Sequence, residues 1–135
     1  MLDQVEDEIV DTRVFERARA ELGGAFLRIL SYFREDGVKA VDRIEHAMRN
    51  GDSASLVLPA HTLKGEARHF GALSLGDLAE TIEMGARRCV DHQETPEELL
   101  VPVARLRSMF EQTLAWFDKE TNPLVARRKQ QNHAS

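Results

Sequence analysis

Residues 60–72 hold most of the side chains in this chain whose types and spacing could do chemistry. An imidazole at His61 is followed three residues later by an ammonium at Lys64, and four residues later by a glycine at Gly65. A neutral imidazole is a nucleophile near neutral pH, and a neighbouring ammonium could neutralise a phosphoryl group bound to the ring. The pattern therefore suggests a histidine that carries a phosphoryl group between proteins.

A helix through this segment would have a core face and an outward face. At about 100° per residue, five apolar side chains fall within an arc of roughly 80°. These core-face residues are Leu56, Ala60, Leu63, Ala67 and Phe70. His61 points about 140° or more from the centre of that arc, so we expect its ring to be exposed. The residues that we expect to contact a partner beside it are Val57, Leu58, Arg68 and His69.

Two residues in this helix affect its backbone. Gly65 lies in mid-helix, where a glycine costs about 1 kcal/mol relative to alanine. It lies one turn from His61 on the outward side, so the missing side chain would let a second protein approach the ring. Pro59 lacks a backbone donor, so a helix that begins at residue 52 either kinks there or starts again near Pro59.

Other kinds of site have less support. A lone histidine on a helix is most often a solvated surface residue. Glu66 and His69 have the spacing of a di-iron carboxylate site, but such a site needs a second pair and two further glutamates. No serine or cysteine stands in a triad context, and we expect Cys89 to be a buried, inert thiol.

Metal and cofactor chemistry is not expected from this chain itself. In-line phosphoryl transfer depends on Mg²⁺, on positioning and on neutralisation of the equatorial oxygens. No carboxylate cluster suited to that metal is evident on the outward face around His61. We therefore expect no cofactor or bound metal, with Mg²⁺ supplied by the partner.

Composition limits the class of protein. The chain has 135 residues, 42% of them hydrophobic and 30% charged, which suits one globular domain. A formal charge of −5 disfavours nucleic acid as a partner. No apolar stretch approaches the roughly 20 residues of a membrane span, and the N-terminus is acidic where a signal peptide would be basic. With a single cysteine, the sequence predicts a cytoplasmic protein, and we expect a monomer.

Helical periodicity dominates the first half of the chain. We expect a short helix over about 11–21, followed by a bend at the glycine pair 23–24. Apolar stripes over 26–33 and 38–48 predict two helices separated at Gly37, with the second ending at Asn50-Gly51.

The second half of the chain also consists of predicted helices. One should be capped by Asp52 or Ser53 and closed by Gly71. The next should begin near Ser74, with Asp77 completing an approximate capping box. The last should begin at the motif Thr95-Pro96-Glu97-Glu98, with Thr95 as its N-cap.

These helices predict an all-α fold, an antiparallel four-helix up-down bundle with a short extra N-terminal helix. We expect a single domain over residues 1–120. Residues 121–135, which include Arg127, Arg128 and Lys129, are expected to form a flexible or frayed tail.

The motif His61-x-Leu63-Lys64-Gly65 resembles the signature of histidine-containing phosphotransfer domains of two-component signalling. The resemblance covers about residues 10–118 and continues through Gly71-Ala72, Leu75, Leu78 and Glu83. It implies a four-helix bundle in which His61 is the phosphoacceptor, Lys64 its basic neighbour and Gly65 the residue that admits the partner. The phosphoacceptor domain of chemotaxis-type kinases is similar too.

The resemblance also implies partners and a role. Aspartate-bearing receiver domains of response regulators and hybrid histidine kinases would exchange phosphate with His61. The chain would be a phosphocarrier in a phosphorelay, and not an enzyme, because no ATP-binding segment follows. It departs from the family at Glu66, Arg68 and His69, where small residues are usual. A helical module that binds these partners without accepting phosphate is the alternative, although His61 and Lys64 are both retained.

Overall fold

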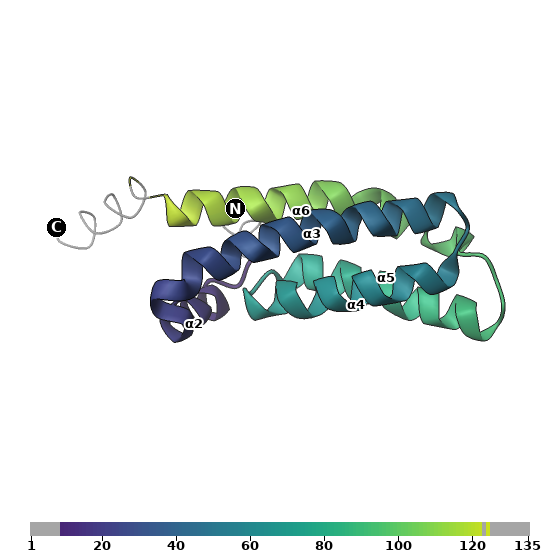
Figure 1. The fold of residues 1–135 in the computed structure, drawn as a ribbon, viewed down its shortest axis with the longest axis horizontal. Helices are drawn as coiled ribbons and strands as arrows, with labels where there is room; N and C mark the ends of the chain where they lie inside the picture. The colour runs from purple at the N-terminus through teal and green to yellow at the C-terminus, as the bar shows by residue number, and fades with distance from the viewer. Residues whose placement is uncertain (1–8, 123, 125–135) are drawn as a thin grey trace.

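The structure, a computed structural model, describes residues 9–122 and 124, and every regular element in these residues is helical. Four long helices run along the molecule (Figure 1): α3 (Phe26–Arg49), α4 (Ser53–His69), α5 (Leu73–Asp91) and α6 (Leu100–Thr121). A shorter helix, α2 (Thr12–Leu22), precedes them, and two 3-10 turns, η1 (Gly23–Ala25) and η2 (Glu97–Leu99), lead into α3 and α6. The all-α prediction is confirmed.

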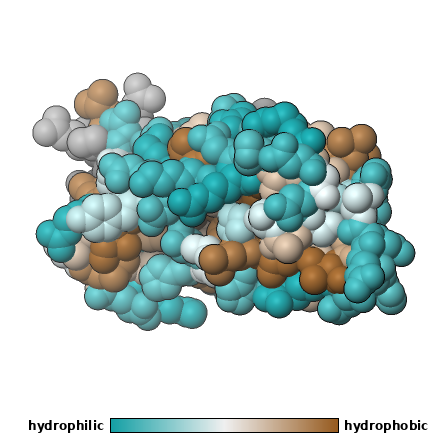
Figure 2. Space-filling model, turned by 45° about the vertical axis from the view of Figure 1, so that its right-hand side comes forward, coloured by the Kyte–Doolittle hydropathy of each residue, from teal (hydrophilic) through white to brown (hydrophobic). Residues whose placement is uncertain are grey.

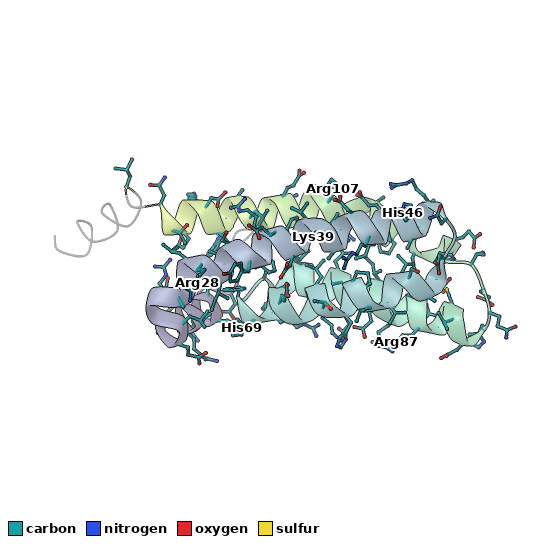
Figure 3. The ribbon with its side chains drawn as sticks, in the orientation of Figure 1. Arg28, Lys39, His46, His69, Arg87 and Arg107 are labelled. Atoms are coloured by element: carbon teal, nitrogen blue, oxygen red, sulfur yellow. The ribbon has the colours of Figure 1, made fainter. Side chains whose placement is uncertain are left out.

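The long helices lie side by side. In Figure 1, α3 and α6 form one side of the molecule, α4 and α5 form the other, and α2 lies at the end where α3 begins. Helix α4 packs against α3 and α5, and α6 packs against the same two helices. Arg107 on α6 ties this helix to α3 by ion pairs with Asp42 at 2.6 Å and Glu45 at 2.7 Å (Figure 3).

Several predicted helix boundaries are confirmed. Asp11 caps α2 by accepting from the backbone N–H groups of Arg13 and Val14, and Asp52 caps α4 by accepting from that of Ser55. Gly51 and Gly71 follow α3 and α4 with φ of +63° and +80°, a conformation that favours glycine. Their positions in the sequence were sufficient to place these helix ends.

The predicted break at Gly37 is wrong, because α3 continues through it to Arg49. Gly37 is buried, and a Cβ at this position would lie 2.5 Å from Cζ of Phe110 on α6. The glycine therefore permits close packing of α3 on α6 and does not end a helix. As a result, α3 has 24 residues, where two shorter helices were expected.

The predicted capping box at Ser74 and the predicted N-cap at Thr95 are also wrong. Helix α5 begins at Leu73 with Ala72 at the N-cap position, while Asp77 accepts from Arg68 of α4. The last helix starts at Leu100, after the η2 turn, and not at Thr95. In each case the acidic residue pairs with an arginine instead. Asp77 bonds Arg68, and Glu98 bonds Arg88 at 2.7 Å.

The core lies between the four long helices. All five residues of the predicted core face of α4 are at most 3% exposed. Phe15 of α2 stacks on Phe117, and Trp116 meets Phe15 edge to face at 5.0 Å, so these aromatic rings pack the first helix against α6. Two members of the predicted stripes on α3 are exposed, Leu27 at 64% and Val38 at 40%.

Apolar side chains also reach the surface. Figure 2 shows them as a broken band across the lower half of one face, below a mainly polar upper half. Within the described residues, no helix combines the length and apolar character needed to cross a membrane. The expected C-terminal tail, with its three basic residues, falls outside the described part of the chain apart from residues 121, 122 and 124.

Candidate functional site

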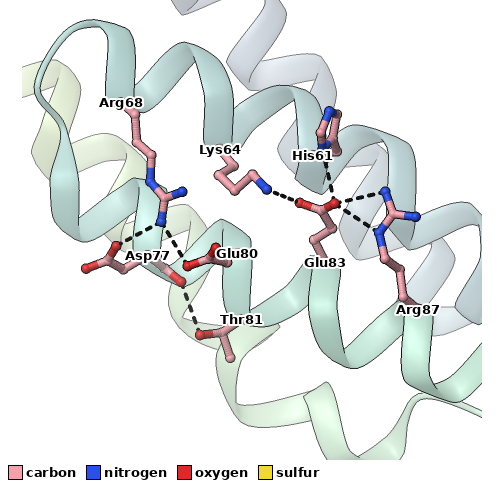
Figure 4. A network of polar contacts seen from close by, with 8 residues as sticks. All are labelled: His61, Lys64, Arg68, Asp77, Glu80, Thr81, Glu83 and Arg87. Atoms are coloured by element: carbon pink, nitrogen blue, oxygen red, sulfur yellow. Dashed lines mark hydrogen bonds and ion pairs between the residues drawn. The ribbon is translucent and has the colours of Figure 1, made fainter.

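The site is centred on His61, in the middle of α4. Its side chain is 55% exposed, and its Nδ1 lies 3.0 Å from Oε2 of Glu83 on α5 (Figure 4). Helix α4 remains a single helix from Ser53 to His69 with Pro59 inside it, so it does not start again near Pro59. His61 thus lies on a continuous helix whose opposite face is buried.

Glu83 is a buried carboxylate that contacts three side chains, those of His61, Lys64 and Arg87. Its side chain is 2% exposed. Oε1 lies 2.8 Å from Nζ of Lys64, and Oε2 accepts from Nε of Arg87 at 3.0 Å as well as facing His61. Burial alone would raise the pKa of the Glu83 carboxyl, but the bonds from Lys64, Arg87 and His61 outweigh burial and lower the pKa to about 2.

The state of Glu83 determines the tautomer of His61. An ionised carboxylate can only accept hydrogen bonds, so the proton between the two groups must sit on Nδ1 of the ring. In the neutral imidazole, Nε2 of His61 then carries the lone pair. In Figure 4 this second nitrogen points away from Glu83. The site therefore presents an oriented nucleophilic nitrogen on the exposed side of the ring.

Glu83 appears in the family signature, but its place in the site was not predicted. On α5 it lies within a run of buried residues that includes Ile82 and Ala86. A carboxylate at a core position is rare unless it is paired. That rarity is the signal by which the sequence could have shown that Glu83 meets a cation or an imidazole of another helix.

Lys64 is largely covered, although helical periodicity places it on the same side of α4 as His61. Its side chain is only 17% exposed, and its ammonium is paired with Glu83. It still lies one turn from His61. Arg87, which sequence reasoning did not single out, is 51% exposed and brings a second cation to the same carboxylate. The charge around the imidazole is therefore shared by Lys64, Arg87 and Glu83.

Gly65 leaves open space beside His61. It is exposed, and a Cβ built on it would meet no atom within 4 Å. This is the geometry expected of a notch in the surface of α4. It contrasts with Gly37 and Gly76, where a Cβ would collide with a neighbouring side chain.

The four predicted partner contacts differ in their surroundings. Leu58 is 71% exposed, while Val57 is half-buried and packs against the core. Arg68 is engaged within the chain, with ion pairs to Asp77 at 3.2 Å and to Glu80 at 2.9 Å (Figure 4). His69 is exposed, with its ring against Phe70. Leu58 and His69 are thus the freest of the four.

Groups that could hold a metal lie away from His61. Among the described residues, the one cluster with suitable ligand atoms is formed by Cys89, near the end of α5, and by Glu94 and Glu98, which follow this helix. Its thiol is buried, and a hydrogen bond to Glu98, together with burial, raises the pKa of Cys89 to about 11. Glu66 and His69 belong to no such cluster in this part of the chain.

Over the described residues, the fold is a bundle of helices, and the site is a surface histidine whose ring contacts a buried carboxylate. The family model of the Hpt domain matches residues 28–116, so the chain belongs to the Hpt domain family. It is therefore a histidine phosphotransfer protein of two-component phosphorelays.

A solved structure supports the same fold. The chain resembles the crystal structure of the histidine-containing phosphotransfer protein B (HptB) from Pseudomonas aeruginosa PAO1 with a TM-score of 0.72. The two sequences are 23% identical, and the match covers 83% of this chain and 93% of that one. No curated protein matches the sequence significantly.

Proposed function

We propose that His61 is the phosphoacceptor, which receives a phosphoryl group from the aspartate of a receiver domain or of a hybrid histidine kinase and passes it to another receiver. The observation that carries this proposal is the contact of Nδ1 with Glu83 on a half-exposed side chain, which in the neutral imidazole assigns the proton to Nδ1 and the lone pair to Nε2. The family match supports the class of reaction, and this contact supports the residue.

The transfer needs no proton to be removed from the attacking atom. The lone pair of Nε2 attacks the phosphorus of an aspartyl phosphate, an N–P bond forms, the P–O bond breaks and the aspartate leaves as a carboxylate. The ring proton stays on Nδ1, where Glu83 faces the positive charge of the phosphorylated ring. In the reverse step the N–P bond breaks and its electron pair returns to Nε2.

Neighbouring residues would assist in distinct ways. Lys64 and Arg87 bring positive charge to the negative phosphoryl group, and Gly65 gives the partner access. Val57, Leu58, Arg68 and His69 are the proposed docking residues. Mg²⁺ would come from the receiver, because Glu83 is already occupied by three groups of this chain.

The proposal also covers the arrangement of the helices, the extent of the domain and the oligomeric state. The four long helices would form an antiparallel up-down bundle with α2 as the extra helix, in one domain over residues 1–120. The protein would act as a cytoplasmic monomer without a kinase activity of its own. A phosphate-silent module that only binds receivers is the alternative, but an oriented Nε2 would have no use in it.

Incubation with acetyl-phosphate-charged receivers and Mg²⁺ tests the proposal. The chain should acquire an acid-labile, base-stable phosphoryl group, and His61→Gln should acquire none. His92→Gln is the matched control, because it removes an exposed imidazole at the end of α5, outside the proposed docking residues, and should still be labelled. Labelling of His61→Gln would move the acceptor to another residue, and no labelling of the wild type would favour the phosphate-silent module.

A further inference from the structure

A hollow of about 510 Å³ lies between α5 and α6. Leu78 of α5 and Arg105 and Met109 of α6 are among the residues that line it. Ile9, the first residue that the structure describes, lines it as well. The described residues of this hollow include none of those proposed to act in phosphoryl transfer or in docking. Its occupant should therefore serve another purpose.

The hollow combines an apolar floor with a cation. Leu78 is only 8% exposed, and Ile9 and Met109 pack as partly buried side chains against the core. Asp77, the acid in the lining, is already held by an arginine of α4 at 3.2 Å. In the part of the chain that the structure describes, by contrast, no acidic side chain pairs with Arg105. A segment that fits this hollow should bring aliphatic side chains and a negative charge.

The eight residues that precede Ile9 have this composition and a matching pattern. At about 100° per residue, Leu2, Val5 and Ile9 fall within an arc of about 60°. The backbone of Ile9 is itself helical. The acidic residues of the segment lie outside that arc: Asp3, Glu6, Asp7 and Glu8. The sequence of this segment thus predicts an apolar stripe that ends in the hollow and is flanked by carboxylates.

The size of the hollow favours a segment of this chain over a separate partner. Stable interfaces between free proteins bury about 1,200–2,000 Å², and a hollow whose apolar lining is Ile9, Leu78 and Met109 offers much less. A tethered segment needs less contact, because its effective concentration reaches the millimolar range. Residues 1–8 are attached at Ile9, within the lining itself.

We propose that residues 1–8 occupy the hollow between α5 and α6 as a continuation of the apolar stripe. Leu2 and Val5 contact the apolar floor, and a flanking carboxylate faces Arg105. A segment in this position touches both helices and holds α5, which carries Glu83, against α6. This inference is independent of the proposed function.

Cysteine pairs introduced into the whole chain test the contact. Under mild oxidation, Val5→Cys with Met109→Cys should close as a disulfide within one chain, because the contact brings the two Cβ atoms near the roughly 4 Å that the bond requires. Gln4→Cys with Met109→Cys is the matched control, because Gln4 lies about 130° from the centre of the stripe and should not reach Met109. The native Cys89 is buried and should not compete.

Thermal unfolding tests the two kinds of contact. Val5→Ser should lower Tm by about 4 °C, and Gln4→Ser should leave it unchanged. The double variant Glu6→Gln and Glu8→Gln should lower Tm by about 2 °C at low salt, but not in a background that carries Arg105→Gln. This background separates the pairing with Arg105 from the general loss of negative charge.

Each measurement can overturn the proposal. Equal cross-linking of the two cysteine pairs, or its absence in both, would place the segment elsewhere. Disulfides that join two chains would mean that the hollow takes the segment of a second copy. An unchanged Tm in Val5→Ser would refute the apolar contact, and an equal effect of the Glu6 and Glu8 changes with and without Arg105 would refute the charge pair.

Discussion

Nδ1 of His61 on α4 lies 3.0 Å from Oε2 of Glu83 on α5, so the imidazole is held by the neighbouring helix. The same carboxylate bonds Lys64 and Arg87. One buried group thus links the orientation of the ring, the positions of two cations and the packing of α4 on α5. Changes at any of these residues should therefore affect both stability and transfer.

Glu83→Gln should alter the pH dependence of stability. In the folded protein the pKa of Glu83 is about 2, below the ordinary 4.5. A lowered pKa stabilises the fold fully above pH 4.5, and the contribution, on the order of 3 kcal/mol, is lost as the pH falls toward 2. Urea unfolding at pH 6 should show Glu83→Gln to be less stable than wild type, with the gap narrowing toward pH 2.

Glu80→Gln is the control for that experiment, because Glu80 also pairs with an arginine but is far more exposed, at 45%. Its effect on the free energy of unfolding should stay within about 1 kcal/mol at both pH values. A gap between wild type and Glu83→Gln that does not change with pH would contradict the assigned ionisation of Glu83.

Lys64→Ala should destabilise the protein more than Arg87→Ala. The Lys64 side chain is 17% exposed and that of Arg87 is 51% exposed, although both bond Glu83. Losing the buried partner leaves a desolvated carboxylate oxygen without a cation, which costs about 2 kcal/mol. Loss of the exposed partner should cost less than about 1 kcal/mol. Chemical denaturation measures both, and equal costs would show that burial does not distinguish the two cations.

Gly65→Ala and Gly37→Ala should have opposite effects, although each places alanine inside a helix. At Gly65 nothing lies within 4 Å, so the gain in helix propensity, about 1 kcal/mol, should raise Tm. At Gly37 the new Cβ would overlap the Phe110 ring, and overpacking costs about 1–3 kcal/mol. Calorimetry measures both Tm values. A raised Tm in Gly37→Ala would mean that α3 and α6 can separate without cost.

Gly65→Arg should separate folding from docking. The position is exposed and helical, so circular dichroism should show the wild-type helix content. A long side chain one turn from His61 would fill the space that a receiver must occupy, and transfer from a charged receiver should fall at least about tenfold, equivalent to 1.4 kcal/mol. Transfer at the wild-type rate would show that the open glycine is not needed for access.

Features decided by neighbouring residues could be predicted from the sequence. The caps at Asp11 and Asp52, the ends at Gly51 and Gly71 and the core face of α4 depend on local backbone chemistry and helical periodicity. The exposure of His61 followed from the same periodicity. For these features, residues within one or two turns supply all the information.

Features decided by distant residues could not be predicted. A glycine inside a helical pattern predicts a helix end at Gly37. Its actual role is to make room for Phe110, which is 73 positions away in the sequence. The pairing of Asp77 and Glu98 with arginines could not be predicted either, because Arg68 and Arg88 lie on α4 and α5, away from the carboxylates they bind. The cover over Lys64 could not be predicted for the same reason, since its partner Glu83 lies on α5.

Gly71 extends these long-range dependencies to the beginning of the chain. Its carbonyl accepts from the backbone N–H of Asp11 at 2.7 Å, and a Cβ there would lie 2.6 Å from the Asp11 carbonyl oxygen. The matched family region begins only at residue 28, yet Val10 and Phe15 are fully buried. A fragment trimmed to the matched region would therefore lose the bond that anchors the turn between α4 and α5, and we expect a stable fragment to need the residues from Val10 onward.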